Sequence, residues 1–147
     1  MSDGNKAILP VSIRVRGYHL DAYQHVNNAR YLEFLEEARW HWLETSGDLA
    51  WYMQRGVGFV IANININYRK PALLNQHLSV DCHLERLGER SGVLQQRIVC
   101  VESGDLIADA AITFVCVDMK TQKVLALEGD LRERLEQGFA RGCGATT

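Results

Sequence analysis

The sequence lacks long apolar runs and clusters of like charge, and both absences exclude classes of protein. No stretch approaches the roughly 18 consecutive apolar residues of a membrane-spanning helix, and residues 1–10 lack the apolar centre of a secretory signal. Sixteen Lys and Arg are balanced by eighteen Asp and Glu, which gives a net charge of −2 with no basic block. We therefore expect a soluble, cytoplasmic protein that binds neither membrane nor nucleic acid.

The chain lacks closely spaced cysteines, since its four cysteines are widely separated and form no Cys-x-x-Cys pair. Cys82, Cys100 and Cys116 fall in apolar runs, where cysteine usually acts as a small hydrophobe; the fourth is Cys143. We expect neither disulfides nor a zinc site. Hydrophobic residues make up 47% of the chain, enough for one core. We expect a single domain over residues 1–147, ordered over about residues 10–138.

The clearest periodic pattern is helical and begins at Asn28. Apolar residues recur at spacings of three and four, with charged residues on most of the other face. The apolar positions are Tyr31, Leu32, Phe34, Leu35, Ala38, Trp42 and Leu43, and the charged ones are Glu33, Glu36, Glu37 and Arg39. Asn27 or Asn28 can cap the start and Gly47 can end the helix after about five turns. Residues 49–54 predict one or two further turns.

Strand patterns lie on both sides of this helix. Residues 11–16 alternate, with Val11, Ile13 and Val15 on one face. Four later runs, at residues 59–68, 77–87, 93–101 and 106–117, predict strands that hairpins can join. Residues 131–137 predict a terminal helix, and we expect the N-terminal arm and the tail of residues 141–147 to be frayed.

Three asparagines mark the run of residues 59–68, although strands seldom favour this residue. Alternation places Asn63, Asn65 and Asn67 on one face of the strand. The residues expected on the opposite face are Val60, Ile64, Ile66 and Tyr68. We interpret the asparagine face as solvated or facing another subunit, in preference to direct contact with a substrate.

This order of elements predicts an α+β fold, in which a five-stranded antiparallel sheet wraps around one long central helix. That arrangement is the hotdog architecture. A single helix covers only one face of the sheet, so the other face and the edge strands stay partly open. We therefore expect a homodimer or a homotetramer.

The loop of residues 17–28, GYHLDAYQHVNN, has no clean period and gathers polar residues, as functional loops do. With the following helix it resembles the 4-hydroxybenzoyl-CoA thioesterase family, in particular its bacterial long-chain acyl-CoA thioesterases. The pattern is an Asp after the first strand, often His-Val-Asn, then a Tyr and a Glu on the helix. The matching residues are Asp21, His25, Val26, Asn27, Asn28, Tyr31 and Glu37. The likeness continues through NININYRKPA and ADAAITFVCVDMKTQK, and so covers about residues 11–137.

The resemblance implies hydrolysis of medium- to long-chain fatty acyl-CoA to fatty acid and coenzyme A, without a metal or other cofactor. Such a reaction needs one group that attacks the carbonyl or activates water, and another that holds the oxyanion. Asp21 can be the first, as nucleophile or general base, because an Asp is already ionised at neutral pH. The spare N–H groups of a helix N-terminus can be the second, and the resemblance assigns that role to the backbone of Asn28.

Further residues are predicted to bind the substrate. Arg69, Lys70 and Arg90 lie at strand ends, where they can meet coenzyme A phosphates or remain ordinary surface charges. The other predicted contacts are Tyr23, His25, Asn27 and Tyr31. On the helix, Tyr31, Phe34 and Trp42 are interpreted mainly as core residues, although an acyl chain running along the helix would touch some of them.

Several alternatives remain open at this point. Asp21 can be a loop carboxylate that only binds nearby backbone amides, and His19, Asp21 and His25 are a weaker set of candidate metal ligands. The protein can also be a thioesterase for acyl carrier protein, which requires an electropositive patch, or a binder that holds acyl-CoA intact. A hotdog dehydratase or hydratase is disfavoured because the motif does not resemble that family.

Overall fold

The computed structural model describes residues 10–46 and 48–141 of the chain, and its elements follow the predicted order. After β1 (Val11–Arg14) and the short 3-10 turn η2 (Gly17–His19) come the helices α1 (Asn28–Ser46) and α2 (Leu49–Gln54). Five strands follow, and α3 (Gly129–Arg141) ends the fold. The strands are β2 (Val57–Tyr68), β3 (His77–Val80), β4 (His83–Leu87), β5 (Gly92–Cys100) and β6 (Leu106–Asp118). The predicted N-terminal arm, the helix stop at Gly47 and Cys143 lie outside the described residues.

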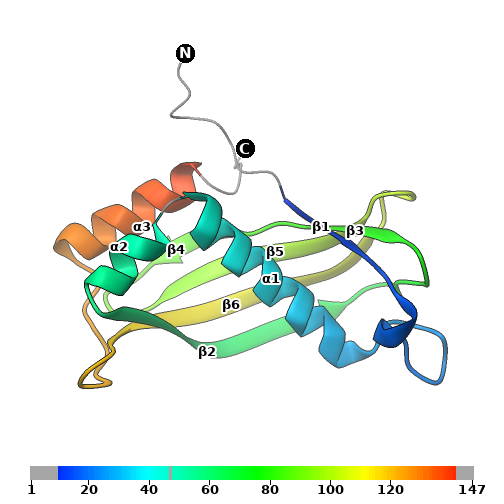
Figure 1. The fold of residues 1–147 in the computed structure, drawn as a ribbon, viewed down its shortest axis with the longest axis horizontal. Coiled ribbons are helices and arrows are strands. Elements are labelled where there is room, and N and C mark those ends of the chain that lie inside the picture. Colours follow the sequence, from blue (N-terminus) through cyan, green and yellow to red (C-terminus); the bar gives the residue numbers. More distant parts are fainter. Residues whose placement is uncertain (1–9, 47, 142–147) are drawn as a thin grey trace, which may run out of the picture.

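The strands form one antiparallel sheet in the order β1-β3-β5-β6-β2, with β4 also paired to β5. Helix α1 lies across one face of this curved sheet, and α2 and α3 lie near its C-terminal end (Figure 1). Within the sheet β5 and β6 are interior strands, and no residue of β6 is exposed. The predicted hotdog fold is therefore confirmed.

The sheet has six strands because the predicted strand of residues 77–87 is interrupted at Asp81 and Cys82. The backbone N–H of Asp81 still donates to the Arg97 carbonyl at 3.0 Å. The return bond from the Arg97 N–H goes to the side-chain Oδ1 of Asp81 at 2.7 Å. A carboxylate thus replaces a backbone carbonyl in the ladder, and β3 and β4 become separate strands on the same side of β5.

A second correction concerns Val60, which was expected on the same face as Ile64. Its side chain is 44% exposed, whereas Phe59 and Ile61 pack against the core. The register runs from the pair of Ile61 with Phe114 to the pair of Asn63 with Thr113, which leaves residue 62 as an extra residue in β2. Such a bulge shifts the alternation of side chains by one position. The predicted core face is therefore correct for Ile64 and Ile66, which follow the bulge, and wrong for Val60, which precedes it.

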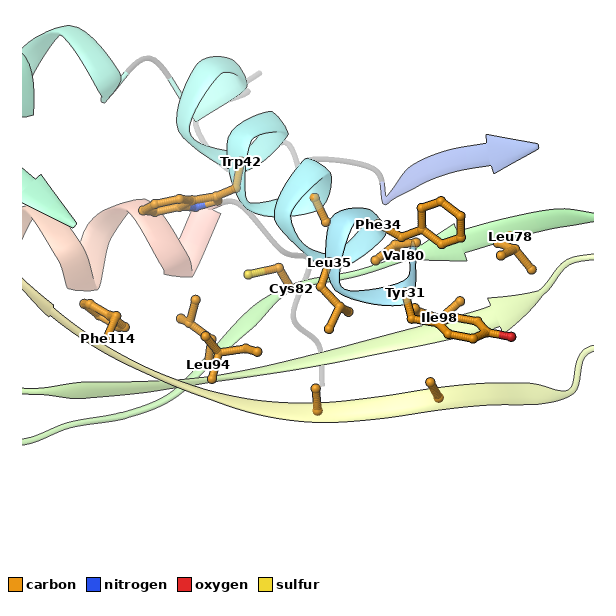
Figure 2. Close-up of a cluster of buried hydrophobic side chains, with 14 of the residues drawn as sticks. Tyr31, Phe34, Leu35, Trp42, Leu78, Val80, Cys82, Leu94, Ile98 and Phe114 are labelled. Atoms are coloured by element: carbon orange, nitrogen blue, oxygen red, sulfur yellow. The ribbon is translucent and has the colours of Figure 1, made fainter. Parts of the chain in front are cut away.

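The core lies between the buried stripe of α1 and the sheet. Figure 2 shows Tyr31, Leu35 and Trp42 of α1 pointing toward strand residues such as Ile98 and Phe114. Leu35 and Ile98 are fully buried, and burying a side chain of this size stabilises the fold by roughly 1.5–3 kcal/mol. The predicted amphipathic helix is confirmed, since its buried residues are the predicted apolar ones: Tyr31, Phe34, Leu35, Ala38 and Trp42.

The cysteines of the described segments are core residues. Cys82, Cys100 and Cys116 are buried, and burial raises the pKa of the Cys116 thiol to about 12. This confirms the prediction that they act as small hydrophobes. Over the described residues, no helix has the length and apolar character needed to span a lipid bilayer.

Candidate functional site

The loop that leads into α1 holds Asp21 in a fixed position. An isolated bridge between Leu20 and Val26 closes the loop, and the Asp21 N–H donates to the His25 carbonyl at 2.8 Å. The carboxylate oxygen Oδ1 accepts the N–H groups of Tyr23 at 2.8 Å and His25 at 3.3 Å. The half-buried carboxylate thus holds a turn through one oxygen, as the structural alternative predicted. Its other oxygen, Oδ2, accepts no hydrogen bond from the described residues and is available for chemistry.

The tip of α1 provides the second requirement, a hydrogen-bond donor that the helix does not use. Asn27 is the cap: its Oδ1 accepts the Ala29 N–H at 2.9 Å, and its carbonyl accepts the Arg30 N–H at 2.9 Å. The Asn28 N–H has no acceptor among residues 10–46 and 48–141. This free donor lies at the positive end of a 19-residue helix dipole. The structure therefore selects Asn27 as the cap and leaves the backbone of Asn28 able to hold an anion.

Two tyrosines pack beside this tip. The Tyr31 hydroxyl is buried and accepts the Ala72 N–H at 3.0 Å. Burial raises the pKa of Tyr31, and the charge of Asp21 acts in the same direction, so the hydroxyl stays protonated near the carboxylate. Tyr68 donates its hydroxyl to the Asn28 carbonyl at 3.1 Å, with its ring centroid 5.5 Å from that of Tyr31. Sequence reasoning missed Tyr68 at the site, because only the register of β2 brings the end of that strand to the helix tip.

The other polar loop residues play different parts. His19 is buried: its Nδ1 accepts the Arg16 N–H at 2.9 Å, and its ring meets the edge of Phe34 with centroids 5.0 Å apart. Burial lowers the pKa of His19, which favours the neutral ring. The side chains of Tyr23 and His25 are exposed. In the described part of the chain, no three His, Cys, Asp or Glu side chains group so that they could hold a metal ion.

The three predicted phosphate-binding cations are not at one place. Arg69 and Lys70 follow β2 next to the helix tip. Arg69 forms an ion pair with the half-buried Asp109 at 3.0 Å, and Lys70 forms an exposed ion pair with Asp105 at 3.3 Å. Arg90 lies in the turn between β4 and β5. Tyr68, at the end of β2, pairs with Ala108 of β6, whereas Gly92, at the start of β5, pairs with Phe114 of the same strand. Six residues of a strand span about 20 Å, so these two ends of the sheet lie about that far apart. Arg90 is therefore remote from Asp21 of the same chain.

A cavity of about 530 Å³ opens at the opposite end of α1. Its walls are mostly apolar and include Trp40, Leu43, Met53, Phe59, Ile61 and Met119. The sequence did not predict it. The available signal was the exposed aromatic ring of Trp40 on a helix whose other large apolar residues are mostly covered, but only the fold brings it opposite α2 and β2.

Comparison with known proteins identifies the family of the chain. Residues 15–135 match the family model of the thioesterase-like superfamily. The chain is 58% identical over 129 residues to the long-chain acyl-CoA thioesterase FadM of Escherichia coli K12, an alignment that covers 88% of this chain and 98% of the relative. It is also 29% identical over 134 residues to the acyl-CoA thioester hydrolase YbgC of Escherichia coli O6:H1, covering 90% and 99% of the two chains.

Solved structures give the same result for the fold. The crystal structure of YbaW from Escherichia coli superposes with a TM-score of 0.85 at 57% sequence identity and covers 89% of this chain and 98% of that one. The helix wrapped by the sheet and the match over most of the sequence indicate the same family. The chain belongs to the thioesterase-like superfamily, with the hotdog fold that its sequence predicted.

Proposed function

We propose that the protein is an acyl-CoA thioesterase of the 4-hydroxybenzoyl-CoA thioesterase type, resembling the bacterial long-chain acyl-CoA thioesterase III. It hydrolyses medium- to long-chain fatty acyl-CoA to fatty acid and coenzyme A. The observation that carries this proposal is the pairing of a fixed Asp21 carboxylate, with one free oxygen, and the spare Asn28 N–H of α1. The identity of 58% to a protein named as a long-chain acyl-CoA thioesterase supports the choice of substrate.

The two groups divide the reaction between them. The thioester carbonyl is attacked either by Asp21 Oδ2, which forms a mixed anhydride that water then hydrolyses, or by a water that Asp21 deprotonates. In both routes the carbonyl oxygen becomes an oxyanion that accepts the Asn28 N–H and is stabilised by the helix dipole. The C–S bond then breaks and coenzyme A leaves as a thiolate. Trapping an acyl group on Asp21 with hydroxylamine would distinguish the first route from the second.

The cations beside the tip suit the nucleotide end of the substrate. Lys70 forms an exposed ion pair, of a kind typically worth about 0–1 kcal/mol. A phosphate group can therefore replace the Asp105 carboxylate at little cost. Arg69 is held more firmly, because it binds both oxygens of Asp109. Tyr23, His25 and Asn27 lie in the same loop as Asp21 and are proposed to contact the substrate there. Arg90 can take part only if another subunit brings it to this site.

A homodimer, or a homotetramer built from it, is proposed from the open edge of the sheet. Within residues 10–46 and 48–141, β2 pairs with β6 and has no strand on its other side. Its 12 residues contain no charged side chain or proline to discourage further pairing. Analytical ultracentrifugation would show an assembly larger than the 16.6 kDa chain. The buried thiols of Cys100 and Cys116 suit a reducing compartment, and we propose a cytoplasmic location.

The function is tested by measuring release of free thiol from hexanoyl-, dodecanoyl- and hexadecanoyl-CoA, with dodecanoyl acyl carrier protein as the rival substrate. We expect faster release from the longer acyl-CoA esters than from the carrier protein. A strong preference for the carrier protein, abolished by salt, would instead support the rival enzyme. Acyl-CoA that binds without any thiol release would identify a non-catalytic binder and refute the proposal.

A further inference from the structure

The cavity at the C-terminal half of α1 has the chemistry of a site for hydrocarbon. Among the described residues of its lining, the charged ones are Glu36 and Arg39, both from α1. The Arg39 guanidinium donates to Oε1 of buried Gln96 at 3.1 Å, and Glu36 is exposed and accepts the Trp40 indole N–H at 3.2 Å. Both charged groups are thus engaged with protein, while the remaining wall is apolar. The volume of about 530 Å³ lies within the usual range of small-molecule sites.

A path along the molecule joins the catalytic loop to this cavity. On α1, Asn28, Leu32, Glu36 and Trp40 are spaced four residues apart and so share one stripe of the helix. Leu32 is 37% exposed and Trp40 is 45% exposed, so the stripe is not covered by the core. Strand β2 accompanies the helix: its last residue, Tyr68, bonds to Asn28, whereas Ile61 and Phe59 line the cavity.

The length of this path sets a condition on the ligand. Eight residues separate Asn28 from Glu36, where the cavity begins, and a helix rises about 1.5 Å per residue, so the distance is about 12 Å. Each carbon of an extended acyl chain advances it by about 1.25 Å, because a carbon–carbon bond of about 1.5 Å is inclined to the chain axis. An acyl chain therefore needs about ten carbons before its end enters the cavity, and a hexanoyl chain falls short.

We propose that this cavity holds the methyl end of a long acyl chain whose thioester lies between Asp21 and Asn28, and that Ile61 and Met119 set the accepted chain length. The inference rests on the proposed function for the position of the thioester. Ile61 contributes to the wall from the core side of β2. Met119 forms an outer wall and lies against Gly58, where a Cβ atom would collide with its sulfur. The glycine therefore makes room for a flexible, polarisable wall that can adapt to a chain end.

Chain-length profiles of two variants test the assignment. Ile61→Trp fills the cavity with a residue that strands accept, and we expect kcat/KM for hexadecanoyl-CoA to fall about tenfold or more while that for hexanoyl-CoA stays within about twofold. Met119→Ala removes the outer wall and should shift the preference toward longer chains. The control is Val101→Trp, which adds the same ring at a position that is 58% exposed, in the turn after β5; its profile should match the wild type.

Fluorescence gives a readout that does not depend on turnover. Trp40 and Trp42 both line the cavity. A fatty acid brominated near its methyl end should quench tryptophan emission in the wild type and not in Ile61→Trp. The same acid brominated beside its carboxyl should quench weakly, because Asn28 and Trp40 are twelve residues, or about 18 Å, apart along the helix.

The outcomes separate the two proposals. Absence of thiol release from every ester would refute the thioesterase function, and methyl-end quenching alone would then still support a hydrocarbon site. Normal hydrolysis with an unchanged chain-length profile in Ile61→Trp, or equal quenching by both brominated acids, would overturn the cavity assignment and leave the thioesterase intact. If Ile61→Trp fails to fold, Met119→Ala replaces it, since Met119 is 53% exposed and its side chain is dispensable for the core. A chain-length profile that does not shift in Met119→Ala would then overturn the cavity assignment.

Discussion

The two ends of α1 differ in the interactions that hold them: polar hydrogen bonds at the N-terminal end and aromatic packing at the C-terminal end. At the N-terminal end, Asp21 and Asn27 satisfy backbone N–H groups through their side chains, and the Asn28 N–H is left over. At the C-terminal end, Trp42 stacks on Phe139 of α3 with ring centroids 4.0 Å apart, beside the apolar cavity. One end is therefore ordered by hydrogen bonds near water, and the other by burial of aromatic surface.

The two ends of the helix therefore suit different parts of one substrate. A fatty acyl thioester has a polar reacting group attached to a long apolar chain. The N-terminal end of the helix and its loop offer a dipole and a carboxylate to the reacting group, and the C-terminal end offers an apolar cavity wall to the chain. Stability and catalysis should then respond to changes at different ends. Substitutions at the loop should affect turnover with little loss of stability, and removal of the buried Trp42 ring at the aromatic end should mainly lower stability.

The largest effect is expected for Asp21→Asn. The amide oxygen can still accept the N–H groups of Tyr23 and His25, so the loop should keep its turn and its affinity for substrate. The charge on the free oxygen is lost, and turnover should fall by about a hundredfold to ten-thousandfold, as for removal of a general base. Thiol release measures turnover, and circular dichroism checks the fold.

A matched control lies at the other end of the sheet. Asp118 also holds a turn through Oδ1, which accepts the N–H groups of Lys120 at 2.8 Å and Thr121 at 3.2 Å. Asp118→Asn should therefore keep near-wild-type turnover. Near-normal turnover in Asp21→Asn, or an equal loss in both variants, would contradict the role given to Asp21.

Next comes Trp42→Ala at the aromatic end. Trp42 is 5% exposed, stacks on Phe139 and donates its indole N–H to the Gly138 carbonyl at 3.1 Å. Its removal should lower the free energy of unfolding by about 3–5 kcal/mol, measured by urea denaturation. Trp40→Ala on the same helix should cost far less because Trp40 is 45% exposed. Equal losses would show that the buried stack is not what stabilises this end.

A smaller effect is expected from the cap at the polar end. Asn27→Ala removes the acceptor of the Ala29 N–H and should lower the free energy of unfolding by about 1 kcal/mol. Asn28→Ala is the comparison: its side chain is exposed and its backbone N–H remains, so both stability and turnover should change little. A severe loss of turnover in Asn28→Ala would show that the side chain, rather than the backbone donor, serves the reaction.

The smallest effect concerns acid stability of the polar end. Hydrogen bonds from the side chain and backbone of His77 lower the pKa of Glu102 from 4.5 to about 2. A lowered carboxyl pKa stabilises the fold above the unfolded value, and this contribution is lost as the pH falls from about 4.5 toward 2. Thermal melts over that range should show a shallower pH dependence for Glu102→Gln than for the wild type. Because both side chains are exposed, the difference should be small.

Much of the fold was predictable because its signals are local. The spacing of apolar residues fixed α1 and its buried face, and the run of residues 49–54 predicted α2 with its observed bounds. The loop motif placed Asp21 before a capped helix, where the structure also has it. The faces of a strand were predicted less well, because the bulge after Ile61 places Val60 on the outer face instead of the predicted core face. A bulge depends on the partner strand, which alternation within one strand does not contain.

The sequence alone determined the helix, its cap region, the carboxylate ahead of it and the membership of the hotdog class, because periodicity, capping and motif spacing involve residues close together in the chain. Only the tertiary structure decided that Tyr68 reaches Asn28 and that Arg90 lies at the opposite end of the sheet from Arg69 and Lys70. It also decided that a cavity opens between α1, α2 and β2. These features come from the packing of segments that are distant in sequence, and their register is set by the energetics of the whole sheet.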